Sequence, residues 1–490
     1  MGTSEKLQAA SYKLQAASCR TFAQVASLAL LAVLLTAVAV VGLQGGGAQG
    51  LFLALALALV IGLVIIVVAG LDGWLPVLFA LSLLTALNLH VESMGLTLYA
   101  FDPLLLALYA AWLWRAYRGQ AQPLRLTSLD GLGLVLLAWL LLASLLGRHV
   151  PTALNGWLLY LRGVLIYFYF AHALGERWSL RALVALLLAM VAVQAGVGFL
   201  QYATRSNVGS LSDLVGRTVS TVREVATAET TLFRVRGTLN TDTSLAHWLD
   251  VLVPLALSLW LAARTGTRRL LLGLVVLGGT GVQVLTFTRG GWFGLTAGLA
   301  VVLWLQFRGR LRRRQVVVAV VAVALLGLLL WPFAGLIRAR LLESQEDTLR
   351  VRKNLNRTAL AMIADYPLTG IGLDNFVRVA PEYSTGWGWQ AEGEMHKVHN
   401  VYLALASEAG PLGLLLFLGF VGLLLAQTWR RMRRGPEEGL WETGPLARGL
   451  LAGFVAVLVH GLAAWGLLSY GVFPLFWMLA GLAVGMRNAE

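Results

Sequence analysis

The stretch HNVYLALASEAGPLGLLLFLGFVGLLLAQ, residues 399–427, decides the fold class of this chain. It begins where the polar segment 338–400 ends, and it continues as an apolar run long enough to cross a bilayer as a helix. His399 therefore stands at a predicted membrane–water boundary, held by a rigid helix and reachable by water. Histidine is also the side chain whose ordinary pKa lets it exchange a proton near neutral pH.

The composition is that of a membrane protein. Of 490 residues, 58% are hydrophobic and 13% charged, whereas soluble domains have about 25% charged residues. The apolar runs recur from end to end without the alternation of barrel strands, so we predict an all-α polytopic bundle. The net charge of +14 comes largely from arginines in short loops, which indicates control of topology rather than nucleic-acid binding. The single cysteine, Cys19, excludes an internal disulfide.

The apolar pattern predicts about 12–14 spans, and the first run is too long for a signal-peptide core, so we read it as a retained span. The candidate spans are residues 21–43, 50–70, 73–90, 97–117, 129–147, 153–174, 180–202, 244–263, 269–287, 290–307, 315–337, 401–427, 446–466 and 471–486. With the N-terminus inside, the arginine clusters that follow residues 114, 176, 263, 307 and 429 all lie in cytoplasmic loops, as the positive-inside rule requires.

This topology divides the chain into six parts. They are a cytoplasmic segment (1–20), N-terminal spans (21–202), a first outer loop (203–243), central spans (244–337), a second outer loop (338–400) and C-terminal spans (401–490). Long loops in a compact membrane protein are usually functional. Both outer loops carry arginines against the topological bias, and anion binding is the explanation we predict for them.

Three segments carry candidate anion-binding arginines. Arg289 lies between two spans, beside two glycines that expose backbone amides, and this favours phosphate; the alternative is an arginine that reaches lipid head groups. Arg350 and Arg352 open a predicted amphipathic helix at the membrane surface, which could also grip anionic lipid. Arg236 lies in a predicted anion-contacting turn at the end of the first outer loop.

The second outer loop ends with two histidines, His396 and His399. With Glu392 and Glu394 upstream, a metal site is conceivable, but a glycine-containing loop supports one poorly. His399, at the start of a span and followed by Asn400 and Tyr402, is the better candidate for a general base.

Five segments in order resemble the O-antigen ligase and O-antigen polymerase superfamily. They are RGTLN (236–240), TRGGW (288–292), DYPLTGIGLDNF (365–376), HNVY (399–402) and EAGPLG (408–413), and the resemblance covers roughly residues 230–430. It implies transfer of a glycan from a polyprenyl (undecaprenyl) diphosphate carrier to an acceptor, on the periplasmic face of the bacterial cytoplasmic membrane. Family ligases use lipid A-core as acceptor, and family polymerases use another lipid-linked glycan.

The resemblance also implies roles for particular residues. The functional arginine of the Arg-Gly segment maps onto Arg289, the loop arginine onto Arg350 or Arg352, and the essential histidine onto His399. We expect Arg236 to contact the donor diphosphate, and the positions that support the site to be His396, Asn400, Tyr402 and Glu408. The expected reaction is inverting and needs no metal or other cofactor, because arginines can neutralise the leaving diphosphate.

Two other functions remain open at this point. A polymerase would join lipid-linked repeat units, and a count near fourteen spans is closer to many polymerases than to ligases. A transporter or flippase for lipid-linked glycans would need a polar path through the membrane. The spans contain few charges, Arg162 being one, while the outer loops are polar, which favours chemistry at the surface.

Overall fold

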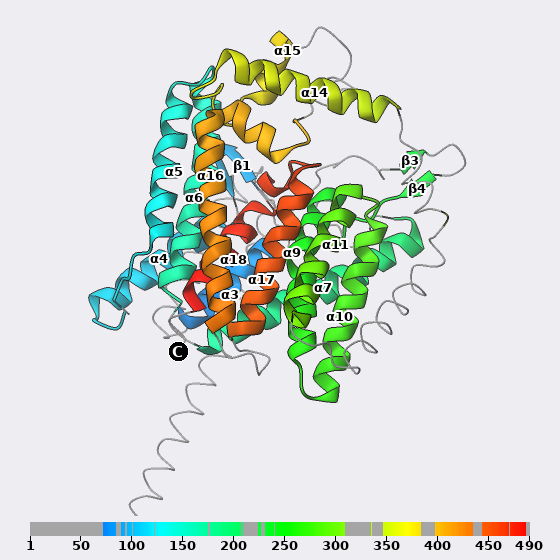
Figure 1. Ribbon diagram of the computed structural model, residues 1–490. Coiled ribbons are helices and arrows are strands. Elements are labelled where there is room, and N and C mark those ends of the chain that lie inside the picture. The colour runs from blue at the N-terminus through cyan, green and yellow to red at the C-terminus, as the bar shows by residue number, and fades with distance from the viewer. Residues whose placement is uncertain are drawn as a thin grey trace, which may run out of the picture. The chain divides into compact units, whose positions relative to one another are not determined.

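The computed structural model describes residues 72–84, 90–93, 96–99, 101–121, 123–174, 177–206, 208, 224–226, 231–239, 241–308, 335, 346–383, 397–434, 443–469 and 471–486 (Figure 1). The predicted segment 1–20, the predicted spans 21–43 and 50–70, nearly all of 315–337, and His396 lie outside these residues. The chain divides into two compact units, one of residues 1–79 and 100–122, the other of residues 80–99 and 123–490.

The first unit contains a short 3-10 helix (Asp72–Trp74), the first half of α3 (Leu75–Leu84) and α4 (Asp102–Tyr117). The ring of Phe79 meets the ring of Phe101 edge to face, with centroids 6.3 Å apart. Pro103 lies in the first turn of α4, where its missing N–H leaves no helical hydrogen bond unmade.

The second unit holds the other helices and two short antiparallel hairpins. The hairpins are β1 (His90–Ser93) with β2 (Leu96–Tyr99), and β3 (Glu224–Ala226) with β4 (Thr231–Phe233). The helices are α5 (Ser128–Leu145), α6 (Val150–His172), α7 (Arg177–Thr204), α9 (Asp242–Ala262), α10 (Gly266–Leu285), α11 (Arg289–Phe307), α14 (Glu346–Asp365), α15 (Phe376–Tyr383), α16 (Val401–Arg434), α17 (Thr443–Gly461), a 3-10 turn (Gly466–Leu468) and α18 (Phe473–Gly485).

The prediction of an all-α polytopic membrane bundle is confirmed. Seven of the described helices are long and apolar enough to cross a membrane, namely α5, α7, α9, α10, α11, α16 and α17. Each coincides with a span predicted from the apolar runs. The hairpin β1–β2 was not predicted, and it stands where the third predicted span ends and the fourth begins.

Glycines allow three of these helices to pack closely. On α17, a Cβ at Gly449 or Gly453 would come 2.7 Å and 2.6 Å from backbone atoms of α9. On α11, a Cβ at Gly294 would come 2.7 Å from the Ala456 carbonyl oxygen of α17. Small residues let helix backbones approach in a membrane, where burial of apolar surface alone gives little drive to associate. Helix α17 therefore packs directly against both α9 and α11 (Figure 1).

A break in α16 is filled by the turn after α14. Pro411 has no N–H to give to the Ser407 carbonyl, and Gly410 has a non-helical backbone with φ of 73°. The backbone N–H groups of Ile371 and Gly372 donate instead to the carbonyl oxygens of Ser407 and Glu408, at 2.9 Å each. Two segments far apart in the sequence thus complete each other's hydrogen bonds.

We expect Gly410→Ala to destabilise the protein by about 2–3 kcal/mol, because alanine resists a positive φ and its Cβ would overlap the Leu368 carbonyl oxygen. The measurement is the thermal unfolding of purified protein in detergent. Gly422→Ala, on the same helix with open space around the position, is the matched control and should cost nothing. Equal melting temperatures for the two variants would contradict this account of the break.

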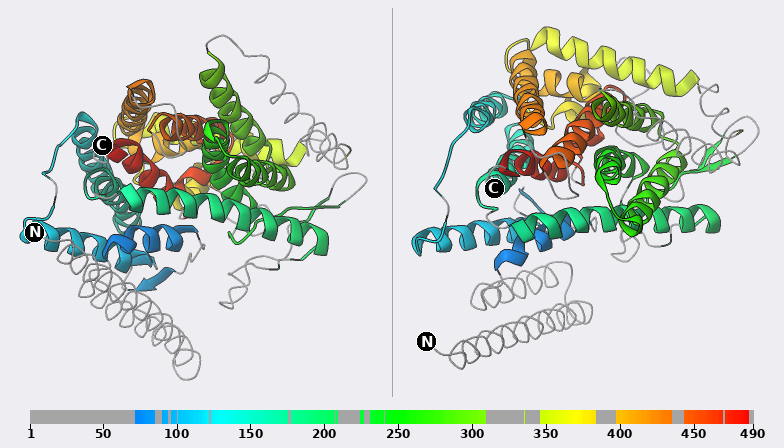
Figure 2. Two further views of the ribbon diagram at one scale, coloured as in Figure 1. Left: turned by 90° about the horizontal axis from the view of Figure 1, so that it is seen from below. Right: turned by 60° about the horizontal axis from the view of Figure 1, so that its bottom comes forward.

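The predicted amphipathic helix is present as α14, but its apolar face packs against protein. Leu355, Ala359 and Met362 recur at helical spacing and are buried with residues of α15 and the start of α16. Leu360 is exposed. Helix α14 lies across the ends of the bundle helices, as Figures 1 and 2 show. This position brings its basic first half to the end of the bundle where α9 and α11 begin.

Candidate functional site

The connection between α10 and α11 is a tight turn of Thr286, Phe287 and Thr288. Phe287 is fully buried and has a left-handed φ of 50°, a conformation that is strained for a bulky residue. Strain of this kind persists only where surrounding contacts impose it, and such positions cluster at functional sites. The turn places Arg289 at the first residue of α11, half-buried, at the end of the bundle.

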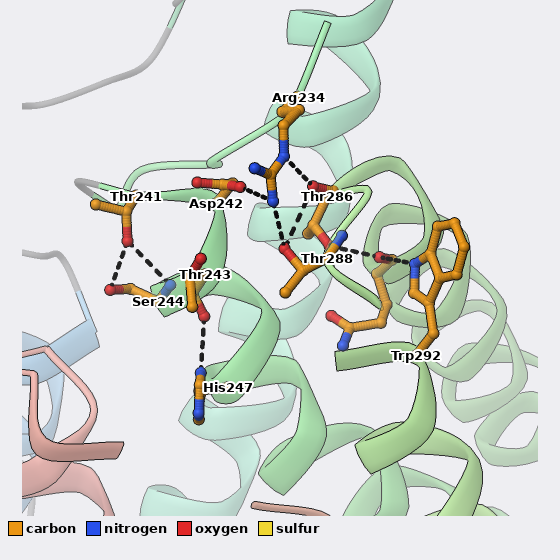
Figure 3. A network of polar contacts seen from close by, with 10 residues as sticks. Arg234, Thr241, Asp242, Thr243, Ser244, His247, Thr286, Thr288 and Trp292 are labelled. Atoms are coloured by element: carbon orange, nitrogen blue, oxygen red, sulfur yellow. Dashed lines mark hydrogen bonds and ion pairs between the residues drawn. The ribbon is translucent and has the colours of Figure 1, made fainter. Parts of the chain in front are cut away.

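Arg234 ties the segment before α9 to this turn (Figure 3). Its Nε donates to the Thr286 carbonyl oxygen and its Nη2 to the Thr288 hydroxyl, both at 2.9 Å. The guanidinium also forms an ion pair with Asp242, in the first turn of α9. Arg234 and Asp242 thereby hold the starts of α9 and α11 together, and their charges offset each other.

Arg352 of α14 joins the two arginines. Its side chain is exposed, yet enough protein surrounds the guanidinium to remove part of its water. The pKa of Arg352 is lowered first by this desolvation and then by the positive charges of Arg289 and Arg234. Among the described residues neither Arg289 nor Arg352 forms an ion pair. Two positive charges without an ion pair among the described residues, one from α11 and one from α14, therefore lie close enough to act on each other.

Arg350 and Arg236 lie differently. Arg350 is exposed and lies two residues before Arg352 on α14. The charges that lower the pKa of Arg352 are those of Arg289 and Arg234, and Arg350 is not among them. Arg236 is buried, with its backbone N–H 3.1 Å from the side-chain oxygen of Gln201. The structure thus groups Arg234, rather than the predicted Arg236, with Arg289 and Arg352.

Two glutamines of α7 hold the turn that contains Arg236. Gln201 accepts from the backbone N–H of Gly237 at 2.9 Å and donates to its carbonyl oxygen at 2.7 Å. Gln194, two helical turns earlier, accepts from the Thr238 N–H at 2.9 Å. These contacts give the predicted RGT turn a structural role, since they fix the segment that leads into α9.

Beneath the start of α11 lies a buried polar group that sequence reasoning missed. His460 Nδ1 is 2.7 Å from a carboxylate oxygen of Asp250, and the Gln283 amide donates to the other oxygen at 2.9 Å. The ring of His247 stacks on that of His460, with centroids 3.5 Å apart. All four side chains are fully buried. The available signal was their place inside apolar spans, because ionisable residues there are costly and usually functional.

The glycines of the TRGGW segment allow α11 to sit on this polar group. A Cβ at Gly290 would come 2.7 Å from His460 Cδ2, and a Cβ at Gly291 would come 2.5 Å from Gln283 Nε2. Gly294 continues the same contact, with a Cβ position 2.9 Å from Asp250 Oδ2. The sequence predicts that the backbone amides of these glycines are available to phosphate. In the structure the glycines also permit the close packing that positions Arg289.

We expect Gly290→Ala to lower any activity that depends on Arg289 about 10- to 100-fold, because a displaced helix start misplaces the guanidinium. Gly196→Ala, at a position with open space, is the control. The measurement is the initial rate of each purified variant, with size-exclusion profiles to show that both are folded. An unchanged rate for Gly290→Ala would show that α11 tolerates the extra methyl group at this contact.

His399 lies two residues before α16, where the start of α16 is held against the end of α17. Asn400 caps α16, accepting from the Tyr402 and Leu403 N–H groups at 2.9 Å and 3.0 Å. The Asn400 amide donates to the Leu462 carbonyl at 3.2 Å, and the Tyr402 hydroxyl donates to the Leu458 carbonyl at 2.7 Å.

The same end of α17 meets α11, since a Cβ at Gly290 would lie 3.1 Å from Ala463. His399 is partly exposed, at the end of the bundle where the arginines gather. Asn400 and Tyr402, predicted to support the site, are thus positioning contacts for the helix start that follows His399.

Glu408 is buried next to the break in α16. Its carboxylate accepts from the Phe376 backbone N–H at 3.3 Å, at the start of α15. It also lines a cavity with Lys397, two residues before His399. Within the described part of the chain, no group of three or more His, Cys, Asp or Glu side chains could hold a metal ion. Glu392, Glu394 and His396 lie outside that part.

Known proteins with similar sequences match the part of the chain that carries these residues. The sequence model of the O-antigen ligase family matches residues 274–418, which run from α10 through α11 and α14 into α16. An O-antigen ligase of Pseudomonas aeruginosa PAO1 is 26% identical over 275 residues, 55% of this chain and 63% of that protein. The similarity thus spans less than two thirds of the relative's length. These matches show that this multi-pass membrane chain is similar to the O-antigen ligase superfamily in the part that they cover.

Proposed function

We propose that this protein is a membrane glycosyltransferase of the O-antigen ligase type. It transfers a glycan from a polyprenyl diphosphate carrier to an acceptor hydroxyl such as that of lipid A-core. The observation that carries the proposal is the convergence of Arg234, Arg289 and Arg352 from three segments, with two positive charges unpaired among the described residues. A diphosphate is an anion of matching charge, and guanidinium groups bind phosphate oxygens bidentately.

The arginines would supply the charge neutralisation that the reaction needs. As the bond between the anomeric carbon and the diphosphate oxygen breaks, negative charge grows on the leaving group. Hydrogen-bond donors that are fixed in place before the reaction stabilise that charge without reorganising. Arg289 and Arg352 supply these hydrogen bonds. Arg234, held by Thr286, Thr288 and Asp242, keeps the starts of α9 and α11 together.

His399 would act on the acceptor. A sugar hydroxyl is a poor nucleophile, and a base at hydrogen-bond distance removes its proton as the new glycosidic bond forms. The carrier diphosphate leaves from the opposite face, so the anomeric configuration inverts. Asn400 and Tyr402 fix the helix start that follows His399 through the carbonyls of α17.

The ends of the helices support an outer-face location for this chemistry. Arg308, at the end of α11, lies over the rings of Trp304 and Trp429 at 5.4 Å and 5.0 Å. This contact places the basic end of α16 beside the end of α11, opposite to Arg289. The positive-inside rule assigns that basic end to the cytoplasm, and the arginine site then faces the periplasm of a bacterial cytoplasmic membrane.

The direct test is transfer by the purified protein in detergent, with a polyprenyl-diphosphate-linked glycan as donor. A product on lipid A-core identifies a ligase, and a lengthened lipid-linked glycan identifies a polymerase. Movement of the donor across a proteoliposome membrane without any new glycosidic bond identifies a flippase and contradicts the proposal.

We expect the purified enzyme to retain its full rate after exhaustive chelation with EDTA, because the arginines neutralise the diphosphate that a cation would otherwise bind. The measurement is turnover before and after chelation, at fixed pH. A rate that falls and returns on addition of Mg²⁺, Mn²⁺ or Zn²⁺ would replace the arginine mechanism, and would make Glu392, His396 and His399 candidate ligands.

A further inference from the structure

A cavity of about 60 Å³ is lined in part by Lys397 and Val398, the two residues before His399. It has room for roughly four to six water molecules, which is comparable to the space that one pyranose ring displaces. Its polar lining comes from α6, the turn before α15, the segment before α16 and α16 itself: Asn155, Asp374, Lys397 and Glu408. Four aromatic residues also line it: Tyr99, Tyr160, Phe376 and Trp465.

The break in α16 and the turn that fills it build this cavity. The turn carries Asp374, whose left-handed φ of 57° is a conformation that aspartate tolerates better than most residues. Glu408 lies two residues before the break at Gly410 in α16, and its carboxyl group accepts from the Phe376 N–H. Two carboxylates from segments distant in the sequence thus line one small space.

The charges in the cavity differ from those at the arginine site. Lys397 forms an ion pair with Asp374, and its ammonium lies 5.2 Å from the centre of the Trp465 ring. Glu408 is then the carboxylate that this lysine does not pair with directly. The charge of Lys397 is thus offset by Asp374, so a phosphate would gain no net attraction in the cavity, whereas hydroxyl groups can form hydrogen bonds with both carboxyl groups. The lining therefore selects a neutral ligand rich in hydroxyl groups.

The position of the cavity links it to the proposed base. Lys397 and Val398 line it, and His399 follows directly. Trp465 and Leu468 line it from the segment after α17, whose Leu462 carbonyl accepts from Asn400. A ligand in the cavity therefore lies next to the residues before His399 and next to the segment after α17 that binds Asn400.

We propose that this cavity binds a neutral sugar ring of the acceptor glycan, so that Glu408 and Asp374 hold its hydroxyl groups beside His399. The assignment rests on the proposed transfer reaction, in which the arginines take the donor diphosphate. An apolar and aromatic wall with a few convergent polar groups is the usual design of a small-molecule site. Tyr160, buried with its ring 4.9 Å from that of Phe473, supplies a rigid part of that wall.

The test is saturation-transfer NMR on the purified protein with the neutral methyl glycosides of glucose, galactose and N-acetylglucosamine. We expect at least one glycoside to bind the wild type, and Glu408→Gln and Asp374→Asn to weaken that binding about tenfold, since each replaces an oxygen that can accept from a sugar hydroxyl group by an NH₂ group. Asparagine tolerates the left-handed backbone at position 374, so we expect Asp374→Asn to fold. It therefore keeps the test valid even where Glu408→Gln fails to fold. Asp365→Asn, a carboxylate of α14 that binds the Tyr383 hydroxyl instead, is the control and should bind as the wild type does.

A parallel measurement separates this inference from the proposed donor site. Inorganic pyrophosphate should raise the melting temperature of the wild type and of the two cavity variants, but not that of Arg289→Ala. Glycoside binding that fails in the wild type, or that is equal in wild type and both cavity variants, overturns the sugar site whatever pyrophosphate does. Loss of the pyrophosphate effect alone, with glycosides behaving as expected, supports the sugar site and contradicts the arginine site.

Discussion

His399→Ala is expected to lower the rate of glycan transfer about 10²–10⁴-fold without reducing the amount of folded protein. The side chain is partly exposed and precedes Asn400, whose contacts fix the helix start, so its removal takes away the base and leaves the cap of α16 in place. The measurement is the initial rate with saturating donor and acceptor, together with a size-exclusion profile of each preparation.

His149→Ala is the matched control. His149 also precedes a helix at a loop, at the N-terminus of α6, and makes no capping hydrogen bond through its side chain. We expect that variant to retain its activity, and His396→Ala to be milder than His399→Ala. Near wild-type turnover in His399→Ala would remove this residue from the mechanism and leave the acceptor proton without its proposed recipient.

Arg289→Ala and Arg352→Ala are expected to raise the donor concentration needed for half-maximal rate far more than the acceptor concentration. Each removes one of the two positive charges that are unpaired among the described residues. Loss of one charge-assisted contact to a phosphate weakens binding about 10- to 100-fold. Arg289→Lys should recover only part of the loss, because lysine lacks the planar pair of donors. The measurement is the rate as a function of donor at fixed acceptor, and then the reverse.

Arg357→Ala is the control for the charge itself. Arg357 is exposed on the same helix as Arg352, and it is not among the residues whose charges act on Arg352. Its removal should leave both half-saturation concentrations unchanged. Full activity of Arg289→Lys at limiting donor would contradict the bidentate contact, and an equal effect of all three alanine variants would point to general attraction of anions.

The helices were predictable because their cause is local. A window of apolar residues long enough to span a bilayer must satisfy its own backbone hydrogen bonds, so it forms a helix whatever surrounds it. The helices α5, α9, α10 and α11 accordingly start and end within three residues of the predicted spans. The hairpin β1–β2 escaped prediction because its short segments resemble the ends of the apolar runs on either side.

The site was predictable only in part. Arg289, Arg352 and His399 are candidates because of their chemical groups, which are visible in the sequence, and because they match residues of the family that the sequence resembles. Arg236 was preferred over Arg234, although the two are separated by one residue, because no local pattern says which faces the α10–α11 turn. The burial of the apolar face of α14 against α15 and α16 likewise depends on partners distant in the sequence.

By itself the sequence determined the class of fold and the places of the long apolar helices, and it predicts the topology, since hydrophobic length and loop charge act locally. The tertiary structure alone decided which side chains meet. The pairing of Asp250 with His460, the filling of the α16 break by residues 371 and 372, and the cavity around Glu408 each join segments far apart in the chain. Such contacts depend on how closely helices approach, and that distance is set by glycines whose role is visible only against the atoms they touch.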